Sequence, residues 1–171
     1  MDGGYRLAAA SLCFPSSWSL AEKFSRSMFE IHEDVPGFNN SRMGQMVARL
    51  FDNLKAGQLV GRFNWSVYPD AGLHHPEPRQ VQIDGVGNAL ARLFIRVERQ
   101  TLRRLPGSGD ILFTIKVYHD PLAALEAEED RATLATGLRE QLLAFDADQV
   151  SYKRLTETRD ALAEALRRLA M

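Results

Sequence analysis

Residues Arg92 to Pro121 read RLFIRVERQTLRRLPGSGDILFTIKVYHDP and contain the strongest structural signal in the chain. Two runs rich in Ile, Val, Phe, Leu and Thr flank a turn cluster at residues 106–109, a pattern typical of a long antiparallel hairpin. In the first run apolar and charged side chains alternate, which predicts one apolar and one polar strand face. The turn does not fix the register, because loops of four and five residues pair different residues.

The apolar row of the first run continues from Val97 to Arg99, so a guanidinium enters a row that begins as core. A buried arginine there needs a partner, a ligand or a bulge. The alternative is that the strand has left the core and Arg99 reaches solvent along its aliphatic stem, and spacing alone favours this second interpretation. Every second residue from Ile111 to Val117 is apolar, which gives the second run an apolar face of its own.

Length and composition are those of one globular domain with room for a helical appendage: 171 residues, 45% hydrophobic and 25% charged. Twenty-one basic and twenty-two acidic side chains leave a net charge of -1, so no overall field favours nucleic acid or an anionic membrane. The single Cys13 excludes an internal disulfide and an iron–sulfur cluster held by this chain alone. Without a bilayer-length apolar run or a signal peptide, a cytoplasmic protein is expected.

The N-terminal third is predicted to contain a strand and a helix. The apolar run from Tyr5 to Phe14 is expected to be a buried strand, with Cys13 as a small buried hydrophobe in preference to a metal ligand. A helix capped by Ser17 or Ser19 is expected to follow and to continue as far as Ile31.

His32 lies at the exit of that helix, and Pro36 bars its continuation. Its acidic neighbours, Glu33 and Asp34, taken alone favour an exposed histidine in a charged loop. The residue pattern leaves both a buried and an exposed His32 open.

The middle of the chain is predicted to contain a helix, a strand and a long loop. The helix is expected to end at Gly57, and the alternating segment Gln58–Tyr68 is expected to be a strand. The segment Pro69–Ala89, rich in Pro, Gly, Asp and His, is expected to be a long surface loop. Its adjacent His74 and His75 make a poor metal site, because neighbouring side chains diverge in an extended chain.

The chain after the hairpin is predicted to be helical. Asp120 and Pro121 are typical of a helix start, and leucines recur on one face at residues 134–142 and 162–169. Packing of these stripes on the sheet is favoured over dimerisation. The whole chain is thus expected to be an α+β protein in which helices lie between early and late strands of an antiparallel sheet, the element order of PAS-type domains.

Seven motifs carry a more specific signal. They are Ala8-Ala9-Ala10-Ser11-Leu12-Cys13-Phe14-Pro15-Ser16, Trp18 with Glu22-Lys23, Ile31-His32 with Val35-Pro36, Arg62-Phe63-Asn64-Trp65, Arg96-Val97-Glu98-Arg99-Gln100-Thr101-Leu102-Arg103-Arg104-Leu105-Pro106, Phe113-Thr114-Ile115 and Tyr152-Lys153. Together they resemble the family of the haem-dependent oxidative N-demethylase α subunit, and the resemblance covers nearly the whole chain.

The resemblance implies a PAS fold over residues 1–121, followed by a helical extension, residues 122–171, that packs on the sheet. It implies a fold that holds haem b and uses oxygen to remove a methyl group from a small secondary amine such as dimethylamine. Electrons would come from NADPH through FMN and a [2Fe–2S] centre on partner reductase subunits, with tetrahydrofolate as the acceptor of the one-carbon unit. Members of the family extend further upstream, and a PAS sheet has another strand before the one expected at Tyr5–Phe14. The resemblance therefore implies either a truncated product that lacks this first strand or an incomplete pocket.

The resemblance also implies site residues. A histidine of the helical segment ligates iron in related haem-binding PAS sensors, which makes His32 the expected axial ligand. Arg62 and Asn64 are the expected polar residues of the cofactor pocket, on the strand after the helices.

Arg96, Glu98 and Arg99 are the expected catalytic residues of the hairpin. Only one face of a strand looks into a pocket, so Arg96 and Glu98 are expected to act together and Arg99 separately. The alternative function is a non-catalytic haem or gas sensor, or a ligand-binding module, with the same fold.

Overall fold

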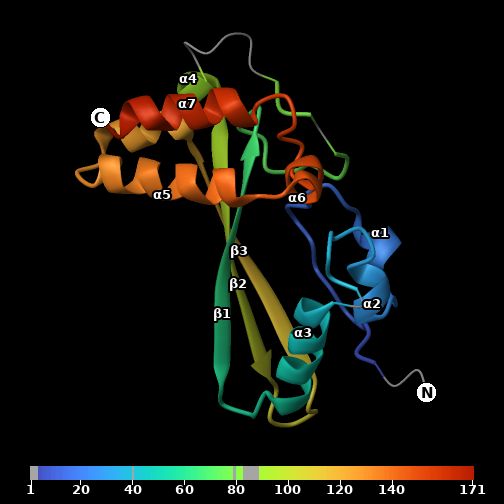
Figure 1. The fold of residues 1–171 in the computed structure, drawn as a ribbon. Helices are drawn as coiled ribbons and strands as arrows, with labels where there is room; N and C mark the ends of the chain where they lie inside the picture. Colours follow the sequence, from blue (N-terminus) through green and yellow to red (C-terminus); the bar gives the residue numbers. More distant parts are fainter. Residues whose placement is uncertain (1–3, 40, 79, 83–88) are drawn as a thin grey trace.

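The computed structural model describes residues 4–39, 41–78, 80–82 and 89–171. Its elements are α1 Leu20–Lys23, α2 Met28–Ile31, α3 Arg42–Asn53, β1 Leu59–Tyr68, α4 Ala89–Arg92, β2 Phe94–Arg104, β3 Ile111–Pro121, a 3₁₀ helix Leu122–Ala127, α5 Arg131–Ala144, α6 Ala147–Tyr152 and α7 Arg159–Leu169. The predicted α+β class is confirmed. Figure 1 shows α5 and α7 across the upper end of the sheet and α3 beside its lower end.

Within the described residues the sheet has three antiparallel strands in the order β1-β2-β3, so the predicted hairpin is confirmed as β2 and β3. The register places Asn64 opposite Glu98 and Glu98 opposite Val117. Because side chains alternate along a strand, one sheet face, called here the polar face, carries Arg62, Asn64, Ser66, Arg96, Glu98, Gln100, Ile115, Val117 and His119. The apolar row of β3 therefore lies beside the charged row of β2.

The main core lies on the opposite face of the sheet, under the C-terminal helices. Val67 and Leu93 share this core with Leu142 and Leu162, so the two leucine stripes pack on the sheet as expected. Leu134, at the start of the first stripe, is 43% exposed, so α5 buries only part of its stripe. The fold thus uses one face of the sheet for its core and keeps polar groups on the other.

The connection from the sheet to the tail differs from the expectation. Asp120 pairs with Ile95 inside the sheet, so β3 continues through Pro121 and the predicted helix start at Asp120 is wrong. A 3₁₀ helix follows, and α5 begins only at Arg131. The division of the chain into domains at Pro121 stays a prediction.

The predicted buried strand Tyr5–Phe14 is wrong. Its backbone bonds to the segment between α1 and α2 instead, with the Leu7 amide donating to the Arg26 carbonyl at 3.0 Å, and forms only the isolated bridge of Arg6 with Ser27 among the described residues. The three alanines at residues 8–10 are exposed, and so is Cys13. Small alanine side chains bury too little apolar area to hold this run in a core.

The predicted single helix up to Ile31 is two short helices. Ser25 has a positive φ of 62°, which interrupts the helical backbone. Ser27 then starts α2 with a capping box in which its side chain accepts from the Glu30 amide and the Glu30 side chain accepts from the Ser27 amide. His32 follows as the residue that ends α2, so its predicted place at a helix exit is confirmed.

The second predicted helix is confirmed as α3. The Ser41 side chain accepts from amides in the first turn of α3. The helix ends at Asn53, before the predicted end at Gly57, because the backbone turns extended at Leu54. Arg104 of β2 donates to the carbonyls of Phe51 and Leu54 at the far end. A cation at a helix C-terminus is favourable, so this contact fixes α3 on the polar face of the sheet.

Most of the predicted long loop, residues 69–78 and 80–82, lies outside named helices and strands, as expected, while residues 79 and 83–88 lie outside the described residues. His75 is nevertheless only 2% exposed, so the prediction of a surface position for it is wrong. The amide of His75 donates to the Pro15 carbonyl at 3.1 Å, and its ring packs 4.5 Å from that of Tyr68. These contacts hold the loop against the sheet.

Candidate functional site

A buried ion pair stands at the centre of the polar face. Arg96 is 1% and Glu98 8% exposed, and the Arg96 Nε donates to the Glu98 Oε1 at 3.1 Å. Two charges leave water at low cost only when every remaining polar atom is also satisfied. The second carboxylate oxygen meets this need, since it accepts from the Gln100 side-chain amide at 3.0 Å.

The rest of the Arg96 guanidinium binds backbone from two other parts of the chain. Its two terminal nitrogens donate to the carbonyl of Leu73 at 3.2 Å and to that of Phe14 at 2.8 Å. The guanidinium carbon lies 5.7 Å from the ring centre of Tyr68. Arg96 therefore positions the N-terminal segment and the loop over the sheet.

The hydrogen-bond network continues across the sheet to β1. Arg62 Nε donates to the Gln100 side-chain oxygen at 2.7 Å, which links Arg62 to Glu98 through Gln100. Arg62 is exposed, and Asn64, two residues further along the same face, is half-buried. Four of the predicted site residues, Arg62, Asn64, Arg96 and Glu98, thus lie on one sheet face.

His32 lies at the end of α2, close enough to Arg62 for the guanidinium to affect its pKa. Its Nδ1 lies 2.8 Å from the Met28 carbonyl and its ring stacks on Phe38 at 4.0 Å. Burial lowers the pKa of His32, and the nearby Arg62 and Lys23 lower it further.

The surroundings of His32 leave one ring nitrogen available. A neutral ring that donates from Nδ1 to a carbonyl keeps its lone pair on Nε2, which has no hydrogen-bond partner among the described residues. Backbone-bonded imidazoles of this kind are suited to bind iron. Within the described ranges, no cluster of three or more His, Cys, Asp or Glu side chains is arranged to hold a metal ion, whereas haem iron needs only one or two protein ligands.

Lys153, which ends α6, was not assigned a role from the sequence. Its Nζ donates to the Trp65 carbonyl at 2.6 Å and lies 5.2 Å from the ring centre of Phe145. Burial lowers the pKa of Lys153 to about 8, although Glu98 opposes the shift. Burial raises the pKa of Tyr152, and the carboxylates of Asp34 and Glu98 raise it further. The motif Tyr152-Lys153 was the only sequence signal for this part of the site.

A pH titration of stability tests the burial of Lys153. The lysine has a pKa of about 8 when folded and an ordinary value of 10.5. Between these values the unfolded chain binds a proton that the folded chain lacks, so the free energy of unfolding rises with pH. We expect the unfolding free energy of the wild type, relative to Lys153→Met, to rise by roughly 2–3 kcal/mol between about pH 7 and about pH 11. Urea unfolding of both proteins across this pH range measures the difference in unfolding free energy. A difference that does not change with pH would contradict the burial of Lys153.

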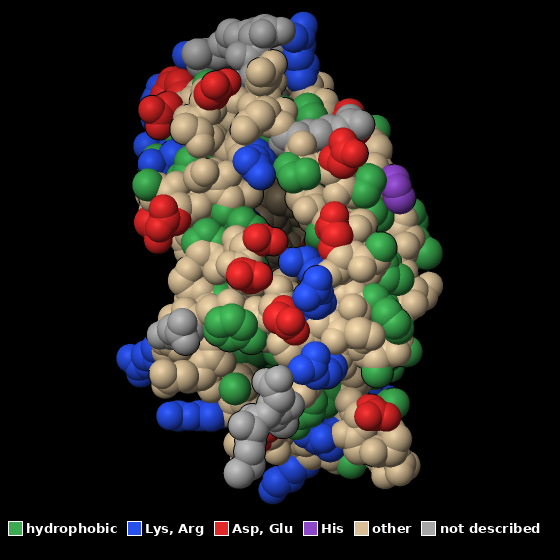
Figure 2. Space-filling model, turned by 90° about the vertical axis from the view of Figure 1, so that its right-hand side faces the viewer, with side chains coloured by type: hydrophobic (Ala, Val, Ile, Leu, Met, Phe, Trp, Pro, Cys, Tyr) green, Lys and Arg blue, Asp and Glu red, His purple; other side chains and the backbone are tan. Residues whose placement is uncertain are grey.

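Figure 2 views the molecule from the side on which α1, α2 and α6 lie, and shows a hollow bordered by acidic and basic side chains. Electrostatic contacts connect residues of the polar face with residues at the ends of α2 and α6. Arg62 acts on the pKa of His32, Tyr152 and Lys153, and Glu98 acts on the last two. The residues from α2, β1, β2 and α6 therefore surround one polar site.

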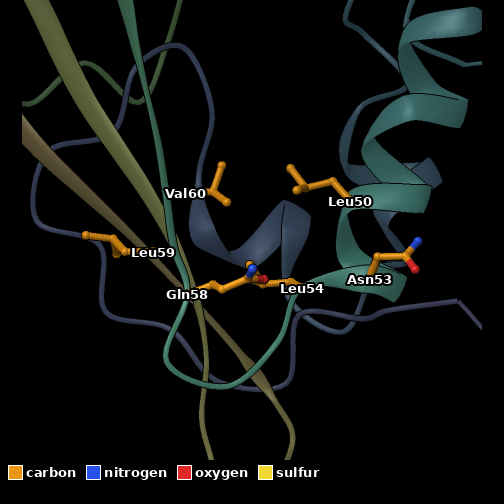
Figure 3. Close-up of a pocket in the computed structure, with 6 residues that line it drawn as sticks. All are labelled: Leu50, Asn53, Leu54, Gln58, Leu59 and Val60. Carbon is orange, nitrogen blue, oxygen red and sulfur yellow. The ribbon is translucent and has the colours of Figure 1, made fainter.

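A pocket of about 380 Å³ lies between the end of α3 and the start of β1, at the lower end of the sheet (Figure 3). Its lining residues are Leu50, Asn53, Leu54, Gln58, Leu59 and Val60. None of them titrates, so this pocket has no acid or base of its own. Val60 shares the polar face with Arg62, and the pocket provides an apolar wall next to the charged site.

Arg99 lies apart from these residues. It is exposed on the opposite face of the sheet, in register with Phe63 and Lys116. Arg99 thus lies on the other strand face from Arg96 and Glu98 and reaches solvent, while the catalytic roles of the three residues stay predictions. No described contact joins Arg99 to the polar site.

Two further findings bear on identity. Every helix within the described part of the chain is too short or too polar to cross a membrane. Residues 1–163 match the family described as haem-dependent oxidative N-demethylase, alpha subunit-like. The match covers the helices that carry His32, the whole sheet and the C-terminal residues that complete the polar site. The chain belongs to the haem-dependent oxidative N-demethylase, alpha subunit-like family.

Proposed function

We propose that this chain binds haem b through His32 and takes part in the oxidative N-demethylation of a small secondary amine such as dimethylamine. The family name indicates haem dependence, and the observation that carries the proposal is the neutral His32 imidazole whose Nε2 is unpartnered among the described residues. A PAS fold over residues 1–121 with a helical extension over residues 122–171 is part of the same proposal.

Haem is a large, flat, mainly apolar group with polar edges, and the polar face of the sheet offers side chains of both kinds. Apolar side chains of β3 on the polar face are partly exposed, Phe113 by 49% and Ile115 by 36%. The Arg62 guanidinium and the Asn64 side-chain amide could bind the polar edge of the haem group. Haem, when bound, would supply the activation of oxygen, while the protein supplies its binding and orientation.

The amine is assigned to the carboxylate of Glu98. A carboxylate beside an arginine can orient an ammonium group while the guanidinium of Arg96 keeps the local charge balanced. Lys153, with a pKa of about 8, is the group of this site that can hold or release a proton near neutral pH. Arg62 and Gln100 hold Glu98 in place through their hydrogen bonds.

Electrons have to come from other polypeptides. The chain has a single cysteine, too few for a [2Fe–2S] centre, and lacks a Gly-rich strand-to-helix fingerprint for a dinucleotide. An alpha subunit implies partner subunits, and to these we assign FMN, the iron–sulfur centre, NADPH oxidation and tetrahydrofolate.

A non-catalytic binding module is the second candidate. Both oxygens of Glu98 already accept hydrogen bonds, from Arg96 and Gln100, which leaves the carboxylate fewer lone pairs for a substrate. A haem or gas sensor would need no group for an amine, so this observation favours it.

Amine-dependent NADPH oxidation separates the two candidates. We expect that the haem-loaded chain alone does not consume NADPH in the presence of dimethylamine and oxygen, because it has no site for the reductant. Adding the reductase subunit should start NADPH oxidation. It should also release the methyl group as a one-carbon product at the oxidation level of formaldehyde. No turnover with a competent reductase favours the sensor, and sustained turnover by the isolated chain would contradict the assignment of electron transfer to partners.

A further inference from the structure

The lower half of the sheet has a second face that no described helix covers. On it lie Leu59, Phe63, Leu112 and Tyr118, which are 61%, 70%, 47% and 40% exposed. With Arg99, Arg103 and Lys116 of the same rows, these residues form what we call the open face. Apolar side chains gathered on an exposed surface are typical of interaction sites.

The helical tail ends short of the open face. Trp65 Nε1 donates to the Gln141 side chain at 2.8 Å, and this contact joins α5 to the sheet just above Phe63. Figure 1 shows α5 and α7 only across the upper end of the sheet, with α3 beside the lower end. Arg104, which binds the end of α3, belongs to the polar face, so α3 does not cover the open face either.

The charges of the open face all have one sign. Arg99, Arg103 and Lys116 are exposed and form no ion pair with a described residue. The acidic strand residue on this side of the sheet, Asp120, lies beyond Tyr118 toward the upper end of β3, opposite Ile95 and outside the open face. Only the ring of Tyr118 meets Lys116, at 4.9 Å from its Nζ. Three uncompensated cations around exposed aromatics complement an acidic surface with an apolar centre.

We propose that the open face docks a partner subunit of this α subunit, through a surface that presents acidic side chains around an apolar patch. Phe63, in register with Arg99, is the anchor, because aromatic and arginine side chains dominate binding energy in such interfaces. A second copy of this chain fits less well, since a two-fold contact would press Arg99 and Lys116 against their own equivalents. The proposal rests on membership of an α-subunit family and on the proposed role of partners as electron donors.

The test uses the haem-loaded full chain and the purified reductase subunit that carries flavin and the iron–sulfur centre. In the double variant Arg99→Glu/Lys116→Glu we expect the dissociation constant to rise about 100-fold, mainly through slower association. Wild-type binding should weaken at least about tenfold between about 50 mM and about 300 mM salt. Biolayer interferometry measures both.

The control variant is Arg42→Glu/Arg131→Glu, which reverses two exposed cations at the starts of α3 and α5 and should stay within about twofold of wild type. Phe63→Ser should weaken binding without changing the salt dependence. Unchanged affinity in the Arg99→Glu/Lys116→Glu variant overturns the proposal. Self-association of the wild type in sedimentation that Phe63→Ser abolishes also overturns it, in favour of a second copy. The haem spectrum, recorded on every variant, reports on the proposed function separately from docking.

Discussion

Replacing His32 by alanine is expected to abolish the absorption spectrum of histidine-ligated haem in the reconstituted protein. The imidazole combines a lowered pKa, a carbonyl-bonded Nδ1 and an Nε2 without a partner among the described residues. Without this ligand, haem has no axial nitrogen from α2, and haem titration should give only weak, unspecific absorbance. The change is measured by titrating haem into the purified variant.

His74→Ala is the matched control for this experiment. His74 is exposed and its ring meets only the Cys13 carbonyl, at 3.4 Å. Its removal should leave the spectrum as in the wild type. An unchanged spectrum in His32→Ala would contradict the assignment of the axial ligand and direct attention to Cys13 or His119.

Replacing Arg96 by alanine is expected to cost about 3–5 kcal/mol in the free energy of unfolding. The substitution leaves Glu98 as a buried charge without its cation and deprives the carbonyls of Phe14 and Leu73 of their donors. Urea unfolding followed by circular dichroism measures the loss. Because Glu98 is the proposed site of the amine, the affinity for the amine should also fall in Arg96→Ala.

Arg99→Ala provides the comparison within the same strand. Arg99 is exposed and binds none of the described carboxylates, so its removal should change stability by less than about 0.5 kcal/mol. Equal losses for Arg96→Ala and Arg99→Ala would show that the buried network does not stabilise the fold. Glu98→Gln, which keeps the shape of the side chain, then separates the effect of charge from that of packing.

Alternation along one strand was enough to predict how the hairpin distributes its charges. A period of two puts Arg96 and Glu98 on one face and Arg99 on the other, whatever the partner strands do. The alternation does not give the register, and only the register reveals that Ile115 and Val117 share a face with the charged pair.

Other features depend on contacts that no local pattern contains. The apolar run Tyr5–Phe14 resembles a strand, yet a strand forms only beside a partner, and its neighbour here is the turn around Arg26. Lys153 meets Asn64 at 3.5 Å across 89 positions of sequence. The burial of Lys153 depends on how α6 packs against the sheet. The dipeptide Tyr152-Lys153 therefore contributed to the family resemblance, but the lowered pKa of Lys153 could not be predicted from it.

The guanidinium of Arg96 couples the opening of two surface segments. The segment that contains Phe14 and the loop that contains Leu73 each bind Arg96, and the backbones of Ser17 and His75 bind one another at 2.7 Å. Neither segment can lift away without breaking bonds that the other shares. Local opening of these two segments is therefore expected to be one cooperative event. Its free energy should be well above the free energy of opening a loop that has no such shared contacts.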